Sequence, residues 1–258
     1  MKIATFNANS IRTRISIIME WLEKEWPDIL CLQETKAQDK DFPLSDFKDI
    51  GYNAFFRGQK SYNGVAFISR QPISDIRKDL YDSGDEQARF ISGRLLDTQI
   101  INVYVPQGVA PGTDKFEYKI KWLRDLLSHV KATYNPGEPL LMVGDFNVAL
   151  QPLDVYDPEG LRGKAGFHEE EQKAIRDILQ WGFTDLFRQH EPAKNGYTFW
   201  DYRIPNGFKR NMGWRIDYML ATDPLAKRCE NVWVDMEPRK KEKPSDHTFL
   251  VAEFKRLT

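Results

Sequence analysis

The sequence predicts an α/β fold in which two packed β-sheets are covered by helices, built as one domain over residues 1–258. Short β-type runs outnumber amphipathic helices, and the two do not alternate strictly as they would in a simple doubly wound sheet. No internal repeat, low-complexity segment or linker rich in Pro, Gly or Ser divides the chain. A hydrophobic share of 41%, with 13% aromatic residues, is ample for one packed core.

The predicted strands are runs of β-branched, aromatic and other apolar residues bounded by turn residues. The clearest is 140–143, the continuous apolar run Leu-Leu-Met-Val, which has the length and bounds of a buried strand. The full set, in chain order, is 2–6, 28–32, 64–69, 89–96, 99–105, 140–143, 215–220, 232–234 and 248–254.

Helices are predicted where apolar residues recur three or four positions apart. This spacing occurs over 11–22, behind the candidate N-cap Ser10, and again over 116–130. A third helix is predicted over about 169–181, with Gly182 as its end. These helices are too few to separate every pair of strands, which again favours two sheets with helices outside them.

Charge gives no global signal for nucleic acid, because 37 Lys+Arg residues face 38 Asp+Glu residues and the formal net charge is −1. A polyanionic partner would therefore have to be bound by a local patch. The densest basic run is 239–243, which most often would be a solvated loop. It directly precedes Pro244, Ser245, Asp246 and His247, so it adjoins residues of chemical interest.

Cysteine usage and hydropathy predict a cytoplasmic protein. Cys31 lies within an apolar run and far from Cys229, so buried thiols are expected rather than a disulfide or a metal site. No segment approaches 18 consecutive apolar residues, and no basic stretch followed by an apolar one opens the sequence. We therefore expect neither secretion nor a membrane partner.

Polar residues of similar chemistry stand at the ends of several predicted strands. Asp145 and Asn147 follow the strand 140–143, and they would project to the same side if the extended geometry persisted, with Phe146 turned into the protein. The other strand ends carry Asn7 and Asn9, Glu34 and Lys36, Tyr104 and Gln107, Asp217, and Asp246 with His247.

Each of these residues also has a structural explanation. Asp145 and Asn147 can form a hydrogen-bonded turn, as Asp and Asn commonly do after a strand. Asn7 can turn the chain, and Glu34 can cap the loop that follows it. Asp217 can pair with Arg215, and His247 can be a core histidine with satisfied hydrogen bonds. Six such strand ends in one chain favour a shared site over six separate structural roles.

The chemistry that needs this set is the hydrolysis of a phosphate ester with a hard divalent cation. Mg²⁺ binds oxygen ligands, and Glu34 is the best ligand candidate. Asn7, Asn147, Tyr104 and His247 can donate to a phosphate. Asp145 suits a base for the attacking water, while Asp217 can fix the tautomer of His247 and keep it cationic.

The ordered blocks together resemble the exonuclease III family of abasic-site endonucleases. They are Asn7-Ala8-Asn9, Leu32-Gln33-Glu34-Thr35-Lys36, Tyr104-Val105-Pro106-Gln107-Gly108, Gly144-Asp145-Phe146-Asn147, Trp214-Arg215-Ile216-Asp217-Tyr218 and Ser245-Asp246-His247. The resemblance implies a four-layer α/β sandwich and a Mg²⁺-dependent cut on the 5′ side of an abasic site that leaves a 3′ hydroxyl. It also implies 3′-to-5′ exonuclease or 3′-end-repair activity, with Mn²⁺ able to substitute for Mg²⁺.

The resemblance further implies a role for each block. It places Glu34 on the metal, with Asn7 and Asp246 nearby, and Asn147 and Tyr104 on the phosphate. Asp145 would orient and deprotonate the attacking water. His247, held by Asp217, would contact or protonate the same phosphate. Whether Asp145 or the Asp217–His247 pair is the formal base stays open, as does the number of metal ions.

DNA contacts are implied in the same way. Phe199 and Trp214 would form the pocket for the flipped-out abasic sugar, whereas Trp200 is expected in the core. Arg203 lies in a loop that enters the minor groove in relatives, and Gln107 is typical of the bacterial and archaeal branch. The backbone contacts expected are Arg12, Lys36, Tyr62 and Arg89. The expected partner is double-stranded DNA with abasic or 3′-blocked sites, bound by a monomer associated with a prokaryotic nucleoid.

Two other classes compete with this prediction. A non-catalytic binding protein of the same fold is disfavoured because the expected ligands and catalytic residues are all present, namely Glu34, Asp145, Asn147, Asp217, Asp246 and His247. A phosphoesterase acting on inositol phosphates, sphingomyelin or unspecific DNA shares the Asp-x-Asn and Asp-His pieces. Such enzymes generally lack the Trp-Arg-Ile-Asp-Tyr block together with Tyr-Thr-Phe-Trp, both of which occur here at 214–218 and 197–200.

Overall fold

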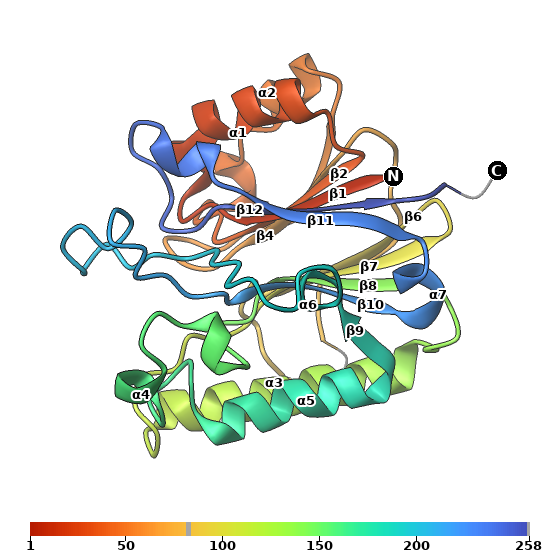
Figure 1. Cartoon of the computed structure of the whole chain (residues 1–258). Coiled ribbons are helices and arrows are strands. Elements are labelled where there is room, and N and C mark those ends of the chain that lie inside the picture. The colour runs from red at the N-terminus through yellow and green to blue at the C-terminus, as the bar shows by residue number, and fades with distance from the viewer. Residues whose placement is uncertain (81–83, 257–258) are drawn as a thin grey trace.

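A computed structural model describes residues 1–80 and 84–256 of the protein, which form two β-sheets with helices on their outer faces (Figure 1). The strands are β1 (Lys2–Asn7), β2 (Ile29–Gln33), β3 (Asn53–Arg57), β4 (Val65–Ser69), β5 (Ser74–Arg77), β6 (Phe90–Leu95), β7 (Thr98–Tyr104), β8 (Leu140–Asp145), β9 (Phe183–Asp185), β10 (Asp217–Thr222), β11 (Cys229–Asp235) and β12 (Phe249–Phe254). The α-helices are α1 (Ile11–Glu25), α2 (Leu44–Asp49), α3 (Asp114–Thr133), α4 (Pro158–Leu161), α5 (Glu169–Gly182), α6 (Leu186–His190) and α7 (Asp223–Ala226). Single 3₁₀ turns are formed by Asp39–Asp41, Pro152–Asp154 and Glu237–Lys240.

Each sheet has six strands and mixed direction. The first has the order β11-β12-β1-β2-β4-β3, and the second β5-β6-β7-β8-β10-β9. In the first sheet β1 and β2 are parallel, and in the second β7 and β8 are parallel; the other neighbours are antiparallel. The predicted four-layer α/β sandwich is confirmed, with α1 and α2 over the first sheet and α3 and α5 over the second (Figure 1).

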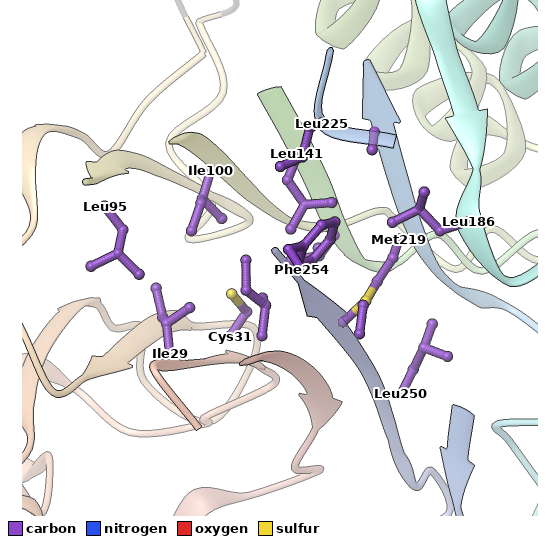
Figure 2. Close-up of a cluster of buried hydrophobic side chains, with 14 of the residues drawn as sticks. Ile29, Cys31, Leu95, Ile100, Leu141, Leu186, Met219, Leu225, Leu250 and Phe254 are labelled. Atoms are coloured by element: carbon purple, nitrogen blue, oxygen red, sulfur yellow. The ribbon is translucent and has the colours of Figure 1, made fainter. Parts of the chain in front are cut away.

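The main core lies between the sheets, because alternate residues of each inner strand point toward the opposite sheet. Ile29 and Cys31 of β2 meet Leu141 of β8, Met219 of β10 and Leu250 of β12 in this layer (Figure 2). Two further clusters fill the space between each sheet and its covering helices. The packing fixes both sheets relative to each other, so residues at one edge of the pair hold defined positions.

The strands missed by the sequence prediction are β3, β5 and β9, each of which is at the edge of a sheet. Edge strands are short and partly exposed, so their apolar pattern is weak; β5, Ser-Asp-Ile-Arg, has no fully buried residue. Ser10 does stand at the N-cap of α1, but its side chain makes no capping hydrogen bond there. Its hydroxyl instead pairs with that of Thr13, at 3.0 Å.

Among the described residues, no helix combines the length and the apolar character needed to cross a bilayer.

Candidate active site

The candidate site lies at one edge of the two sheets, where inward-facing strand positions turn from apolar to polar. In β8, Leu141 and Val143 face the core between the sheets, and Asp145 continues their side of the strand. Asp145 is also aligned across the sheet with Tyr104 of β7 on one side and Asp217 of β10 on the other. The register of the second sheet therefore gathers three of the predicted residues in one row.

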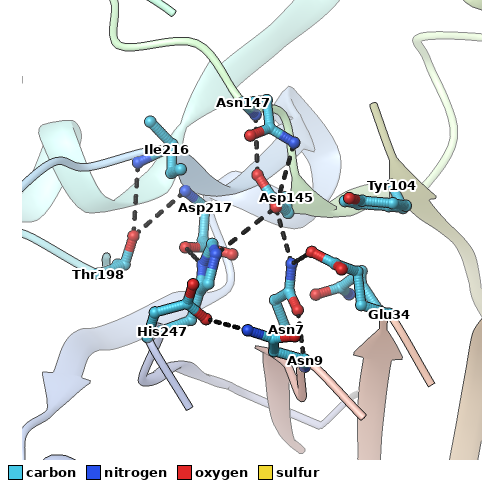
Figure 3. Close-up of polar contacts among 12 residues, drawn as sticks. Asn7, Asn9, Glu34, Tyr104, Asp145, Asn147, Thr198, Ile216, Asp217 and His247 are labelled. Atoms are coloured by element: carbon cyan, nitrogen blue, oxygen red, sulfur yellow. Dashed lines mark hydrogen bonds and ion pairs between the residues drawn. The ribbon is translucent and has the colours of Figure 1, made fainter. Parts of the chain in front are cut away.

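Asn7, at the end of β1, connects this row to the first sheet (Figure 3). Its side-chain amide donates to Glu34 Oε1 and to Asp145 Oδ2, both at 2.8 Å. Glu34 follows β2 and has a left-handed backbone, with φ of 48°. That conformation breaks the strand's alternation and brings the carboxylate to the amide. The Asn7 amide thus hydrogen-bonds two carboxylates, that of Glu34 from the first sheet and that of Asp145 from the second.

Asn147 lies beside Asp145, but a turn places it there and not a continuation of the strand. The extended geometry does not persist, because β8 ends at Asp145 and Asn147 has φ of 53°. Its backbone N–H donates to Asp145 Oδ1 at 2.8 Å, and its side-chain amide donates to the Val105 carbonyl at 3.0 Å. Phe146 is fully buried under the second sheet, as predicted. The acid and the amide therefore share one space despite the turn.

His247 and Asp217 form the predicted pair. Nδ1 of His247 lies 2.8 Å from Asp217 Oδ2, and Nε2 lies 3.7 Å from Asp145 Oδ2. Burial lowers the pKa of His247, but the carboxylates of Asp217 and Asp145 outweigh it and raise the pKa to about 10. The ring is therefore an imidazolium near neutral pH, with Nδ1 paired to Asp217 and with Nε2 beyond hydrogen-bond distance of Asp145. Arg215 does not pair with Asp217, since its guanidinium is bound by Asp154 and Asp185 instead.

The site holds more negative charge than its one imidazolium balances. Burial, with the nearby carboxylates of Asp217 and Glu34, raises the pKa of Asp145 to about 7 against the opposing effect of His247. Asp217 Oδ1 is buried and has no hydrogen-bond partner among the described residues. Side-chain atoms of Asp145, Asp217 and His247 lie within 4.8 Å of one another, and of these three groups the two carboxylates can bind a metal while His247 is protonated. Such an oxygen-rich site fits a hard divalent ion.

Glu34 and Asp246 are joined through Asn9 on the wall of the site. Lys36 Nζ lies 2.9 Å from Glu34 Oε2 and donates to Asn9 Oδ1. Asn9 in turn donates to Asp246 Oδ1 at 2.9 Å. Both residues line the same cleft, so the structure brings together two of the residues that the sequence predicts as metal ligands.

A cleft of about 690 Å³ opens beside these residues. Its apolar part includes Phe199 and Trp214, the two residues predicted to form a sugar pocket, whereas Trp200 is 1% exposed and belongs to the core. The prediction missed Ile216 and Tyr156, which also line the cleft. Ile216 could have been found from alternation, because it lies two positions from Trp214 in an extended segment. Tyr156 lies in a loop with no such signal.

The predicted DNA contacts divide into two groups. Lys36, Gln107 and Arg203 line the cleft, although Arg203 pairs with Asp201 of its own loop at 2.7 Å. The others lie outside the cleft lining: Arg12 and Tyr62 are exposed, and the guanidinium of Arg89 stacks over the Tyr104 ring at 4.7 Å from the centroid.

The basic run 239–243 is not uniformly solvated. Arg239, its first residue, is 8% exposed, and its guanidinium carbon lies 5.0 Å from the ring centroid of Phe208 and 5.6 Å from that of Trp200. The remaining residues of the run are exposed, as expected. Arg239 therefore supports the base of the loop that carries Arg203.

The chain is similar to known nucleases in sequence and in fold. A family model described as Endonuclease/Exonuclease/phosphatase family matches residues 4–247. Exodeoxyribonuclease III of Haemophilus influenzae is 35% identical over 269 residues, which cover 99% of this chain and 100% of the relative. A solved AP endonuclease from Archaeoglobus fulgidus is 42% identical with a TM-score of 0.96, covering 99% of this chain and 100% of that one. A 3′-5′ exonuclease, NExo, from Neisseria meningitidis is 37% identical with a TM-score of 0.95, at the same coverage.

Proposed function

The chain belongs to the endonuclease/exonuclease/phosphatase family, and from this premise we propose that it is a DNA repair nuclease of the exonuclease III and abasic-site endonuclease type. It hydrolyses the DNA backbone on the 5′ side of an abasic site and leaves a 3′ hydroxyl. The observation that most supports this is the position of Asp145, which is hydrogen-bonded to Asn7 and Asn147 beside a cleft with an apolar pocket.

In the proposed reaction, Asp145 takes a proton from the water that attacks the phosphorus. The new bond joins the water oxygen to phosphorus, and the bond between phosphorus and the 3′ oxygen breaks. Asn147 and Tyr104 donate to the non-bridging oxygens, where negative charge grows. The His247 imidazolium, held by Asp217, donates a hydrogen bond to the same phosphate. The departing 3′ oxygen takes a proton from solvent water to become the 3′ hydroxyl, and Asp145 releases its proton to solvent.

The family's enzymes depend on a metal ion, and we propose Mg²⁺ with Glu34 as its main ligand and Asn7 and Asp246 nearby. Bound there, the ion would neutralise charge on the phosphate and the leaving oxygen. Mn²⁺, which also accepts oxygen ligands, can substitute. The chain's own part is to hold these oxygens in place: Asn7 fixes one oxygen of Glu34, and Asn9 fixes one oxygen of Asp246.

Activity on 3′ ends is the second part of the proposal. The solved relatives from Neisseria are described as a 3′-5′ exonuclease and as a 3′ phosphatase bound to a product DNA hairpin. The cleft of this chain is compatible with both 3′ activities. A blocked 3′ end would present its phosphate to the residues that are proposed to bind the scissile phosphate at an abasic site. We further propose that the protein acts as a monomer in the cytoplasm, in association with the nucleoid, on double-stranded DNA.

The proposal is tested with a duplex that carries a single tetrahydrofuran abasic analogue, alongside an undamaged duplex and one with a recessed 3′-phosphate end. Each is incubated with Mg²⁺, Mn²⁺ or EDTA, and the products are sized and extended with a polymerase. The expected result is one cut 5′ to the analogue, with an extendable 3′ hydroxyl, only when a metal is present. No incision at the analogue with Mg²⁺ would refute the abasic-site activity.

A further inference from the structure

Lys119 and Glu171 form an ion pair that is fully buried between α3 and α5, yet neither belongs to the predicted site. The side chains of both are 0% exposed. Removing two charges from water is costly, and a buried pair is weak evidence for stability by itself. The role of the Lys119–Glu171 pair is therefore better inferred from the groups that it contacts.

The three donors of the Lys119 ammonium are all used, two of them by carbonyls of residues that line the cleft. They go to the Glu171 carboxylate, to the Asn147 carbonyl at 2.7 Å and to the Gln107 carbonyl at 3.1 Å. Glu171 in turn accepts from the backbone N–H of Gly166 at 2.8 Å. Three segments from different parts of the chain are therefore joined at one buried point.

Each of these segments contributes to the cleft through a residue that the pair touches. Gln107, Asn147 and Gly166 all line it. Gly166 also lies against Trp214, since a Cβ at Gly166 would come 3.2 Å from the Trp214 ring. The pair thus connects the proposed phosphate contact, Asn147, with the wall of the apolar pocket.

Asn147 needs such support more than an ordinary loop residue does. Its left-handed backbone, with φ of 53°, costs free energy that the surroundings must offset. Its N–H and side-chain amide are held by Asp145 and Val105, and Lys119 holds the remaining backbone group, the carbonyl. All three polar groups of the residue are then fixed.

We propose that Lys119, held by Glu171, is a positioning residue for the reaction: it orients Asn147 toward the scissile phosphate and aligns the two cleft walls. This inference rests on the proposed function. It predicts that loss of the Lys119 ammonium lowers kcat about 10- to 100-fold, the usual effect of removing a group that orients a catalytic residue. KM should change much less.

The test separates positioning from stability by using five variants, which include Asn147→Ala alone as the parent of one double variant. Lys119→Met leaves a buried, unpaired Glu171, so the thermal midpoint should fall. The double variant Lys119→Met/Glu171→Gln has no unpaired charge at this point, so most of the loss in thermal midpoint should be recovered. Its kcat should stay low, because the carbonyls of Asn147 and Gln107 still lack the Lys119 donor. In an Asn147→Ala background, Lys119→Met should cause little further loss of kcat. Lys121→Met, on the same helix but in an exposed pair with Asp125, is the matched control and should match the wild type.

The turnover readouts are the abasic duplex and bis(p-nitrophenyl) phosphate, a plain phosphodiester, both with Mg²⁺. Recovery of kcat together with the midpoint in the double variant would overturn the inference, as would fully additive losses with Asn147→Ala. Wild-type protein that is active on the plain phosphodiester alone would refute the abasic-site proposal but would still test the positioning role. Wild-type protein that is inactive on both would overturn both.

Discussion

Asn9, Glu34, Lys36 and Asn147 all have left-handed backbones, with φ of 44°, 48°, 50° and 53°. Non-glycine residues adopt this conformation at a cost of about 1–3 kcal/mol each. Every one of them has a side chain hydrogen-bonded within the site. The sequence offered the hydrogen-bonded turn of Asp145 and Asn147, which the structure forms. It did not predict the left-handed backbones of Asn9, Glu34 and Lys36, because their hydrogen bonds join segments that are distant in the chain.

At the same scale, the charge state of His247 is a testable property. Its pKa in the folded, metal-free protein is raised to about 10, chiefly because Asp217 and Asp145 outweigh the effect of burial. NMR titration of the imidazole in EDTA should therefore find it protonated at pH 8. Asp217→Asn should move the pKa toward the ordinary 6.5. A wild-type titration near 6.5 would contradict the proposed pair.

The same shift has a consequence for stability. Because the folded pKa of His247 lies above its unfolded value, the protonated ring stabilises the fold fully below pH 6.5, and this contribution is lost as pH rises toward 10. Urea unfolding of the metal-free protein across this range should show the loss. His247→Gln, measured in parallel, should lack that part of the pH dependence.

At the scale of elements, β8 shows what the sequence could predict. Its apolar run predicted a buried strand, and the alternation of Leu141, Val143 and Asp145 places the carboxylate on the inner face. The same alternation places Asn7 of β1 and Tyr104 of β7 on the inner faces of their sheets. The edge strands β3, β5 and β9 were missed because exposure on one side leaves them little apolar pattern.

Gly144 tests how closely β7 and β8 must approach at the site. It has φ of 133°, and a Cβ there would lie 2.0 Å from the Val103 carbonyl oxygen. Gly144→Ala should therefore destabilise the protein by about 2 kcal/mol or more, measured by urea unfolding. Gly112→Ala is the control, since its φ of 81° imposes strain but nothing lies within 4 Å. Equal losses in the two variants would show that the contact with Val103 is unimportant.

At the scale of the whole molecule, the site depends on segments that lie far apart in the chain. Asn7 is near one end of the sequence and His247 near the other, and β1 and β12 bring them together as antiparallel neighbours. Strand pairing of this range could not be obtained from local patterns. The ordered motifs identified the family and hence the arrangement, whereas hydrophobic periodicity alone predicted only two sheets with helices.

The net charge of −1 means that attraction to DNA must come from the residues around the cleft. Fluorescence anisotropy should show that Asp145→Asn protein in EDTA binds an abasic duplex at least about tenfold more weakly at about 200 mM salt than at about 50 mM.

Arg203→Ala should reduce the logarithmic salt slope by about 1 if this arginine leaves Asp201 to contact a phosphate. An affinity independent of salt would argue for a substrate other than nucleic acid.

Single-turnover incision of the tetrahydrofuran duplex by wild-type and Asp145→Asn protein at matched occupancy tests whether Asp145 is the base of the reaction. Because Asp145 is proposed to deprotonate the attacking water, the variant should bind the duplex but cut it at least about two orders of magnitude more slowly with Mg²⁺. Equal rates in the two proteins would contradict the role of Asp145 and the mechanism built on it.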